Sequence, residues 1–384
     1  MWWLYLLLIS GAFMGWSLGT NDAANAFGTA VATRVVKYKT AITIIAVMVI
    51  IGALLQGTGN IDKLATLANS NKVTASTEEV QGAIDAGADA VNDLRVKSTI
   101  KAAIIFACAA LTVFVMSYLK FPVSANQSIT GAIIGWGLCY ANYGDPAVRA
   151  VNMPQLGKFA STWLINPIGA AVISFVITWL VKLFLEKRLT SMAHYDRFIK
   201  IGYIVAGAVA AYSIGVNSSA SVTALYYDLN GATTGVATNL LSDALLPTWQ
   251  LPLLGEVSIA ATLTALIGGV AIAVGVLTFS KRVMMTVGGS IAELNQVEGF
   301  LVILAMALTI LIMEKTMGIP VSTSQAVVGA VIGAGLVNSI KLKSLKNVNF
   351  KVFVRIGIAW VSSPTVAGVL TYVVGIATKS YFGA

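Results

Sequence analysis

Two short segments of this sequence carry the same pattern of hydroxyl and amide side chains behind a proline. Residues 121–138 read F-P-V-S-A-N-Q-S-I-T-G-A-I-I-G-W-G-L, and residues 319–336 read I-P-V-S-T-S-Q-A-V-V-G-A-V-I-G-A-G-L. A proline ends an incoming helix, and the apolar, glycine-rich run that follows it can begin a new one. Each copy therefore predicts a helix N-terminus, with free N–H groups and the positive end of the helix dipole, beside neutral polar side chains.

Free N–H groups beside neutral donors are typical of an anion-binding site. The candidate anion ligands are Ser124, Asn126, Gln127, Ser128, Ser322, Thr323, Ser324 and Gln325. Neither copy contains Lys or Arg, so we expect bound cations to add positive charge. The residues alone predict a small oxyanion and leave phosphate and sulfate open. An acceptor near the cargo, such as Asp22, Gln127 or Gln325, would favour phosphate, because only phosphate brings a P–OH donor.

A second polar group, G-T-N-D-A-A-N-A at residues 19–26, interrupts the apolar start of the chain. A carboxylate at bilayer depth costs about 2.5–3.5 kcal/mol, so Asp22 needs a partner. On a helix, Asn21, Asp22 and Asn25 present oxygen atoms at neighbouring positions, which suits sodium, chiefly at Asp22 and Asn25. The segment A-Y-S-I-G-V-N-S-S-A at residues 211–220 adds Asn217 and Ser218 as candidate sodium ligands. A proton on Asp22, or Asp22 as a helix cap, are the alternatives.

The composition places these groups in a membrane. Hydrophobic residues make up 57% of the 384 residues and charged residues only 11%, against about 25% charged in soluble proteins. Several apolar runs reach the length of about 20 residues that crosses a bilayer. We expect an all-α polytopic membrane protein with about ten membrane-spanning helices and two re-entrant helical hairpins, one at each polar copy.

The two copies lie 198 residues apart and agree at ten of eighteen positions, which indicates an internal duplication. We predict a first repeat over residues 1–181, with an outward loop at 58–98. A cytoplasmic connection at 182–200 leads to a second repeat over 201–384. Basic residues gather in a few short loops, and the positive-inside rule then places both termini outside. An odd number of crossings inverts the second repeat, as in secondary transporters.

Other features exclude several classes of protein. Neither a phosphate-binding P-loop nor a nucleophilic motif is present, so we expect no enzyme and no cofactor. The net charge of +9 comes from loops between apolar runs, which favours a membrane-topology origin over nucleic acid binding. We interpret residues 283–294, with Glu293 and Glu298, as an interfacial amphipathic segment.

The segment G-T-N-D-A-A-N-A and the paired P-V-S-x-x-Q segments together resemble the inorganic phosphate transporter (PiT) family, and the similarity covers nearly the whole chain. Asp22 and Asn25 match the family's G-x-N-D-x-x-N-A signature directly. The second copy of that signature reads G-V-N-S-S-A-S-V, with Ser218 and Ser221 in place of Asp and Asn. The number and symmetry of cation sites therefore stay open.

The resemblance implies import of phosphate coupled to sodium by alternating access, in the plasma or inner membrane. Alternatives are a proton-coupled phosphate or metal-phosphate carrier, a sulfate permease and an anion channel. The expected partners are phosphate, sodium, the lipid bilayer and a second copy in a homodimer. No nucleic acid is expected.

Overall fold

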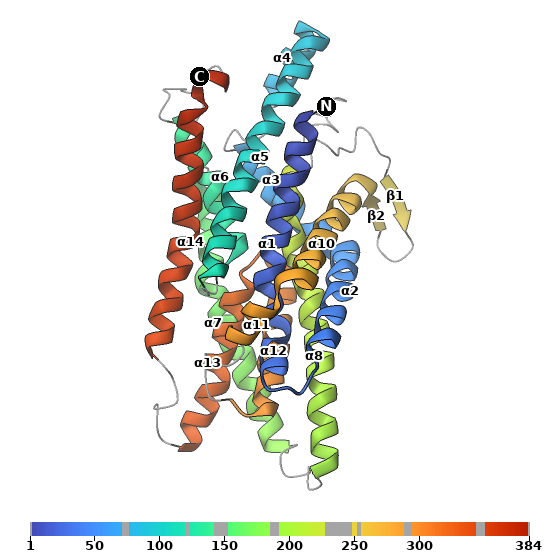
Figure 1. Cartoon of the computed structure of the whole chain (residues 1–384), viewed down its shortest axis with the longest axis vertical. Helices are drawn as coiled ribbons and strands as arrows, with labels where there is room; N and C mark the ends of the chain where they lie inside the picture. Colours follow the sequence, from blue (N-terminus) through green and yellow to red (C-terminus); the bar gives the residue numbers. More distant parts are fainter. Residues whose placement is uncertain are drawn as a thin grey trace.

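The computed structural model of the chain describes residues 2–70, 77–119, 123–141, 153–184, 192–226, 248–251, 255–287, 294–342 and 350–382. Most of these residues form helices whose axes run along the long direction of the molecule (Figure 1). Among them, seven helices are long and apolar enough to cross a membrane. The chain is therefore a polytopic helical membrane protein, as the composition predicts.

The helices of the first half are α1 (Trp2–Ala32), α2 (Tyr38–Gln56), α3 (Ile61–Ser70), α4 (Thr77–Ala86), α5 (Ala88–Tyr118), α6 (Ala125–Ala141) and α7 (Met153–Phe184), with a 3-10 helix η1 (Gly57–Asn60) after α2. The second half contains α8 (Met192–Thr223), η2 (Ala224–Tyr226), α10 (Ile259–Phe279), α11 (Lys281–Val287), α12 (Gln296–Met317), α13 (Thr323–Leu342), α14 (Phe350–Ala377) and α15 (Lys379–Phe382). The candidate spans are α2 with η1, α5, α7, α8, α10, α12 and α14, and α13 is a shorter apolar helix.

Glycines let helices of the two halves approach each other at backbone distance. A Cβ atom on Gly52 of α2 would lie 2.2 Å from the carbonyl oxygen of Tyr212 in α8, and one on Gly215 would lie 2.1 Å from that of Val49. Helix α1 packs on α10 in the same way, through Gly19 and Gly275. Small residues of this kind allow close packing of membrane helices. The first helix of each half is thereby fixed against the second long helix of the other half.

One expectation for the loops is wrong. The described residues of 58–98, which are 58–70 and 77–98, form the end of η1, α3, α4 and the start of α5, with Gly87 at φ 108° between the last two helices. The positive φ suits glycine and ends α4 there, so that α5 starts at Ala88, within the segment predicted to be a loop. The described residues confirm the all-α class, with one short antiparallel hairpin of β1 (Thr248–Leu251) and β2 (Gly255–Ser258) in addition to the helices.

Parts of several predicted segments lie outside the described residues. They are Pro122 of the first polar copy, Glu293 of the amphipathic segment and residues 185–191 of the connection at 182–200.

Candidate functional site

Helices α6 and α13 begin within the two polar copies, as predicted. Ser124 caps α6, because its Oγ accepts from the backbone N–H of Gln127 at 3.3 Å. Ser322 caps α13 in the same way, accepting from the N–H of Gln325 at 3.2 Å. The first residues of each helix, 125–126 in α6 and 323–324 in α13, have backbone N–H groups without an acceptor in their own helix. We call residues 123–128 and 321–325 the hub.

The two segments of the hub, 123–128 and 321–325, hydrogen-bond each other through equivalent positions. Asn126 donates from Nδ2 to the carbonyl oxygen of Val321 at 2.6 Å, and Ser324 donates from Oγ to that of Val123 at 3.0 Å. Asn126 corresponds to Ser324 and Val123 to Val321 at the offset of 198 residues. The helix N-termini therefore meet, although nearly 200 residues separate them in the chain.

Glycines hold each hub helix against a helix that carries an internal proline. A Cβ atom on Gly131 of α6 would lie 2.2 Å from the carbonyl oxygen of Pro364 in α14. The equivalent Gly329 of α13 would place a Cβ 2.1 Å from the carbonyl oxygen of Pro167 in α7. Any side chain at these positions would separate the helices, so glycine sets the position of both N-termini.

Side chains of helix α8 hydrogen-bond the second copy of the polar segment. The amide of Asn217 donates to the carbonyl oxygen of Val321 at 2.8 Å and accepts from its N–H at 2.7 Å. Ser221, one turn further, donates to Oδ1 of Asn126 at 2.6 Å. Both ends of the Asn217 amide thus bond the backbone of the hub, and its Nδ2 also lies 3.4 Å from Oγ of Ser218.

Asp22 lies beside the hub in an unbroken helix. Helix α1 runs through residues 19–26, so Asp22 is not a helix cap. Its side chain is 3% exposed, and Asn25 Nδ2 lies 3.5 Å from its Oδ1. Asn25 also donates to the hydroxyl of Thr323 at 3.2 Å, so Asn25 lies between the Asp22 carboxylate and Thr323. Thr323 therefore joins the candidate cation ligands to the candidate anion ligands.

Two predicted ligands form hydrogen bonds elsewhere, and two others have a side-chain oxygen without a partner among the described residues. Asn21 donates to Ser117 of α5 at 2.7 Å, and Ser128 donates to the carbonyl of Ser124 in its own helix at 3.1 Å. Gln127 and Gln325 are both buried, and the Oε1 atom of each has no hydrogen-bond partner among the described residues. Both glutamine side chains also line a cavity on the side of α7 and α14.

Asn166 of α7 hydrogen-bonds the hub, a contact that the sequence patterns did not indicate. It lies directly before Pro167 in α7 and donates to the carbonyl oxygen of Ser322 at 2.7 Å. The proline is the available signal, because a proline inside a membrane helix frees a backbone acceptor and often marks a functional bend. In the described part of the chain, no group of three His, Cys, Asp or Glu residues could hold a metal ion.

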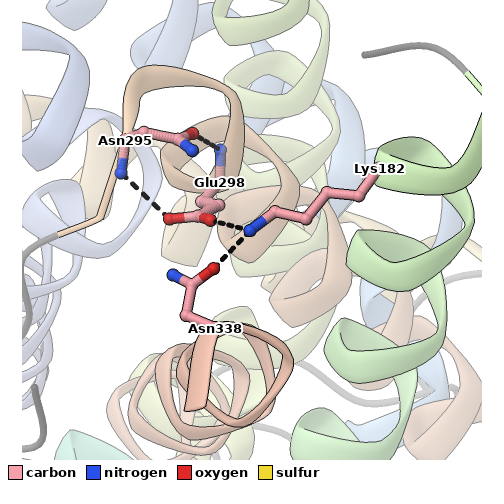
Figure 2. A network of polar contacts seen from close by, with 4 residues as sticks. All are labelled: Lys182, Asn295, Glu298 and Asn338. Carbon is pink, nitrogen blue, oxygen red and sulfur yellow. Dashed lines mark hydrogen bonds and ion pairs between the residues drawn. The ribbon is translucent and has the colours of Figure 1, made fainter. Parts of the chain in front are cut away.

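A second buried polar cluster lies at the far end of α13 (Figure 2). Glu298 forms an ion pair with Lys182 of α7, at 2.5 Å between Oε1 and Nζ, and Lys182 also donates to Asn338 of α13. Asn295 and Glu298 form a capping box at the start of α12. Glu298 is 1% exposed, so its assignment to an interfacial surface is wrong. The partner that allows its burial comes from a helix more than 100 residues earlier.

Polar helix ends that are buried among membrane-spanning helices are the architecture of a membrane transporter. The chain belongs to the phosphate transporter family, whose family model matches residues 18–371. It is a transporter rather than an enzyme, as the sequence predicts.

Relatives and a solved structure agree with this assignment. The chain is 26% identical to a phosphate permease of Pyrococcus horikoshii over 97% of both chains. It is 25% identical to the chloroplastic inorganic phosphate transporter 2-1 of Arabidopsis thaliana, over 90% of this chain and 68% of that protein. A solved structure described as the sodium-dependent phosphate transporter matches with a TM-score of 0.71 at 21% identity, over 99% of this chain and all of the other. This last likeness shows a shared fold.

Proposed function

We propose that the protein is a secondary active transporter that imports inorganic phosphate together with sodium by alternating access. The main observation behind this proposal is that two helix N-termini meet at the hub. Thr323, in the first turn of α13, hydrogen-bonds Asn25, which lies beside Asp22 of α1. Membership of the phosphate transporter family supports phosphate as the cargo. The description of the structural relative as sodium-dependent supports sodium as the coupled ion.

The proposed phosphate site is the hub. Free N–H groups and hydroxyls at two helix starts would supply neutral donors, and the dipoles of both helices would favour negative charge. The proposed ligands are the eight polar residues predicted from the sequence. They are Ser124, Asn126, Gln127 and Ser128 of the first copy and Ser322, Thr323, Ser324 and Gln325 of the second. A transporter has to release its cargo, and neutral donors bind an anion less tightly than a desolvated lysine or arginine would.

The proposed sodium site lies at Asp22 and Asn25, with Asn21, Asn217 and Ser218 as further candidate ligands. A carboxylate with amide and hydroxyl oxygens suits a hard cation. Sodium at Asp22 would neutralise a buried charge and place a positive charge next to Thr323. Each ion would then raise the affinity for the other, which is the thermodynamic basis of coupling.

We infer two inverted repeats, 1–181 and 201–384, with about ten spanning helices. Equivalent contacts occur in pairs, as at Gly131 and Gly329. Helix α6 lies in the upper half of the molecule and α13 in the lower half, so both fit the inner arms of re-entrant hairpins (Figure 1). Helix α1 begins and α14 ends at the same end of the molecule, which supports termini on one side of the plasma or inner membrane. A homodimer remains part of the proposal.

Uptake of radiolabelled phosphate into proteoliposomes tests this function. We expect uphill accumulation under a sodium gradient alone, without competition by excess sulfate. Accumulation under a proton gradient alone would favour a proton-coupled carrier with Asp22 as the proton site. Block by sulfate would favour a sulfate permease, and equilibration without accumulation under any gradient would favour an anion channel.

A further inference from the structure

A cavity of about 930 Å³ lies between α6, α7 and α14, on the side of the hub that faces the membrane. Most of its walls are apolar side chains and glycines, among them Ile134, Leu138, Leu164 and Val369. None of the described residues that line it is charged. Cavities of a few hundred to about 1,000 Å³ are the usual size of small-molecule sites. The cavity suits an uncharged, mainly apolar molecule and not phosphate.

The surroundings of the cavity indicate where such a molecule would come from. Helices α7 and α14 are the least buried of the seven candidate spans. Leu164 of α7 and Val361 of α14 line the cavity, and each is 70% exposed. Apolar residues exposed on a membrane span face hydrocarbon. The cavity is therefore open to lipid chains on one side and reaches the hub at Gln127 and Gln325 on the other.

Three polar atoms at the inner wall have no partner among the described residues. The Oε1 atoms of Gln127 and Gln325 are buried acceptors, and Nε1 of Trp360 is a buried donor. All three side chains line the cavity, and both glutamines are 2% exposed. An unsatisfied buried polar group costs about 1–3 kcal/mol. A hydroxyl group is the simplest neutral partner, because it donates one hydrogen bond and accepts others.

We propose that this cavity binds a neutral, hydroxyl-bearing lipid such as a long-chain alcohol. Its chain lies between α7 and α14, and its hydroxyl group accepts from Nε1 of Trp360 and donates to Oε1 of one of the two glutamines, Gln127 or Gln325. The ligand contacts the back of the hub, since the same two glutamines belong to both regions. The lipid site goes beyond the proposed transport function, and it shares Gln127 and Gln325 with the proposed phosphate site.

Photolabelling of the protein in liposomes tests the proposal. The probe is hexadecanol with a diazirine in its chain, and the matched probe is hexadecane with the same diazirine. We expect the alcohol to label residues around Trp163 and Trp360 about fivefold more than the alkane, as one added hydrogen bond predicts. Trp360→Phe keeps an aromatic ring and removes the indole N–H donor, so it should reduce the preference for the alcohol over the alkane.

Filling the cavity provides a second test. Gly357 lines the cavity and has open space around it, so Gly357→Leu should fold and reduce labelling by the alcohol about tenfold, the equivalent of about 1.4 kcal/mol. Gly157 of α7 also has open space and lies outside the lining, so Gly157→Leu should leave labelling unchanged. Equal labelling by alcohol and alkane would overturn the hydroxyl site. Unlabelled cavity walls in the wild-type protein would mean that another surface, such as a second copy, covers the opening, and would overturn the lipid site.

Discussion

Asn126 and Ser324 occupy equivalent positions in the two copies of the polar segment, and each donates a hydrogen bond to the backbone of the other copy. The acceptors, Val321 and Val123, are equivalent as well. Two hydrogen bonds thus join the starts of α6 and α13 in a nearly symmetrical arrangement. A cargo bound at both helix starts would be released by separating them, so these bonds connect the stability of the hub to its affinity for the anion.

Removing the bond from Ser324 should weaken the hub. Ser324→Ala leaves the buried carbonyl of Val123 without this donor, and we expect a loss of about 1–3 kcal/mol in stability. Apparent affinity for phosphate should fall as well. Thermal unfolding in detergent and equilibrium binding of radiolabelled phosphate measure the two effects.

Thr130→Val is the matched control, because the Thr130 hydroxyl bonds only the Asn126 carbonyl one turn back in its own helix. It should leave phosphate affinity unchanged. An unchanged affinity in Ser324→Ala would remove Ser324 from the site.

Alanine at the hub glycines should separate the helices. Gly131→Ala and Gly329→Ala each place a methyl group about 2 Å from a backbone carbonyl, and overpacking of this kind costs about 1–3 kcal/mol. Gly157→Ala and Gly357→Ala lie on the partner helices in open space, where alanine should stabilise the helix by up to about 1 kcal/mol. Melting temperatures of the four variants compare these effects. Equal shifts at all four positions would contradict the close approach.

The ion pair between Lys182 and Glu298 should stabilise the far end of α13 (Figure 2). Glu298→Gln leaves Lys182 charged and buried, and breaking a buried pair in this way costs about 3–5 kcal/mol. Adding Lys182→Met should recover much of the loss, because the uncompensated charge is then removed. A double-mutant cycle by thermal unfolding measures the coupling between the two residues.

The exposed ion pair of Asp93 and Lys97 on α5 is the control for that cycle. Neutralising it should cost less than about 1 kcal/mol. If the Lys182–Glu298 pair couples no more strongly than this exposed pair, it does not hold α7, α12 and α13 together.

The sequence predicts those parts of the structure that depend on local chemistry. Serine before an apolar run predicts the caps at Ser124 and Ser322, and the duplication predicts that both copies form the same local structure. Burial of Asp22 follows from a lone acid in an apolar stretch. These features can be predicted from residue types and from their spacing over a few helical turns.

The remaining features depend on contacts between distant residues. The charge of Glu298 resembles a surface charge until Lys182 is placed beside it by the packing of α7 on α12. Asn166 and Asn217 are polar residues in apolar helices, and their bonds to the hub backbone appear only when the helices are assembled. The extent of α5 depends on the break at Gly87, whereas the polar composition of residues 58–98 predicts a loop there.

The most direct test of the account is the dependence of phosphate affinity on sodium in the wild-type protein and in Asp22→Asn. Equilibrium binding of radiolabelled phosphate over a range of sodium concentrations measures it, with Ser17→Ala as a control for a buried polar residue of the same helix. Sodium should tighten phosphate binding about 5- to 150-fold in the wild-type and Ser17→Ala proteins, the usual range of coupling between two sites. In Asp22→Asn the dependence should disappear while the protein stays folded. An unchanged sodium dependence in Asp22→Asn would contradict the proposal that Asp22 holds the coupled ion beside the hub.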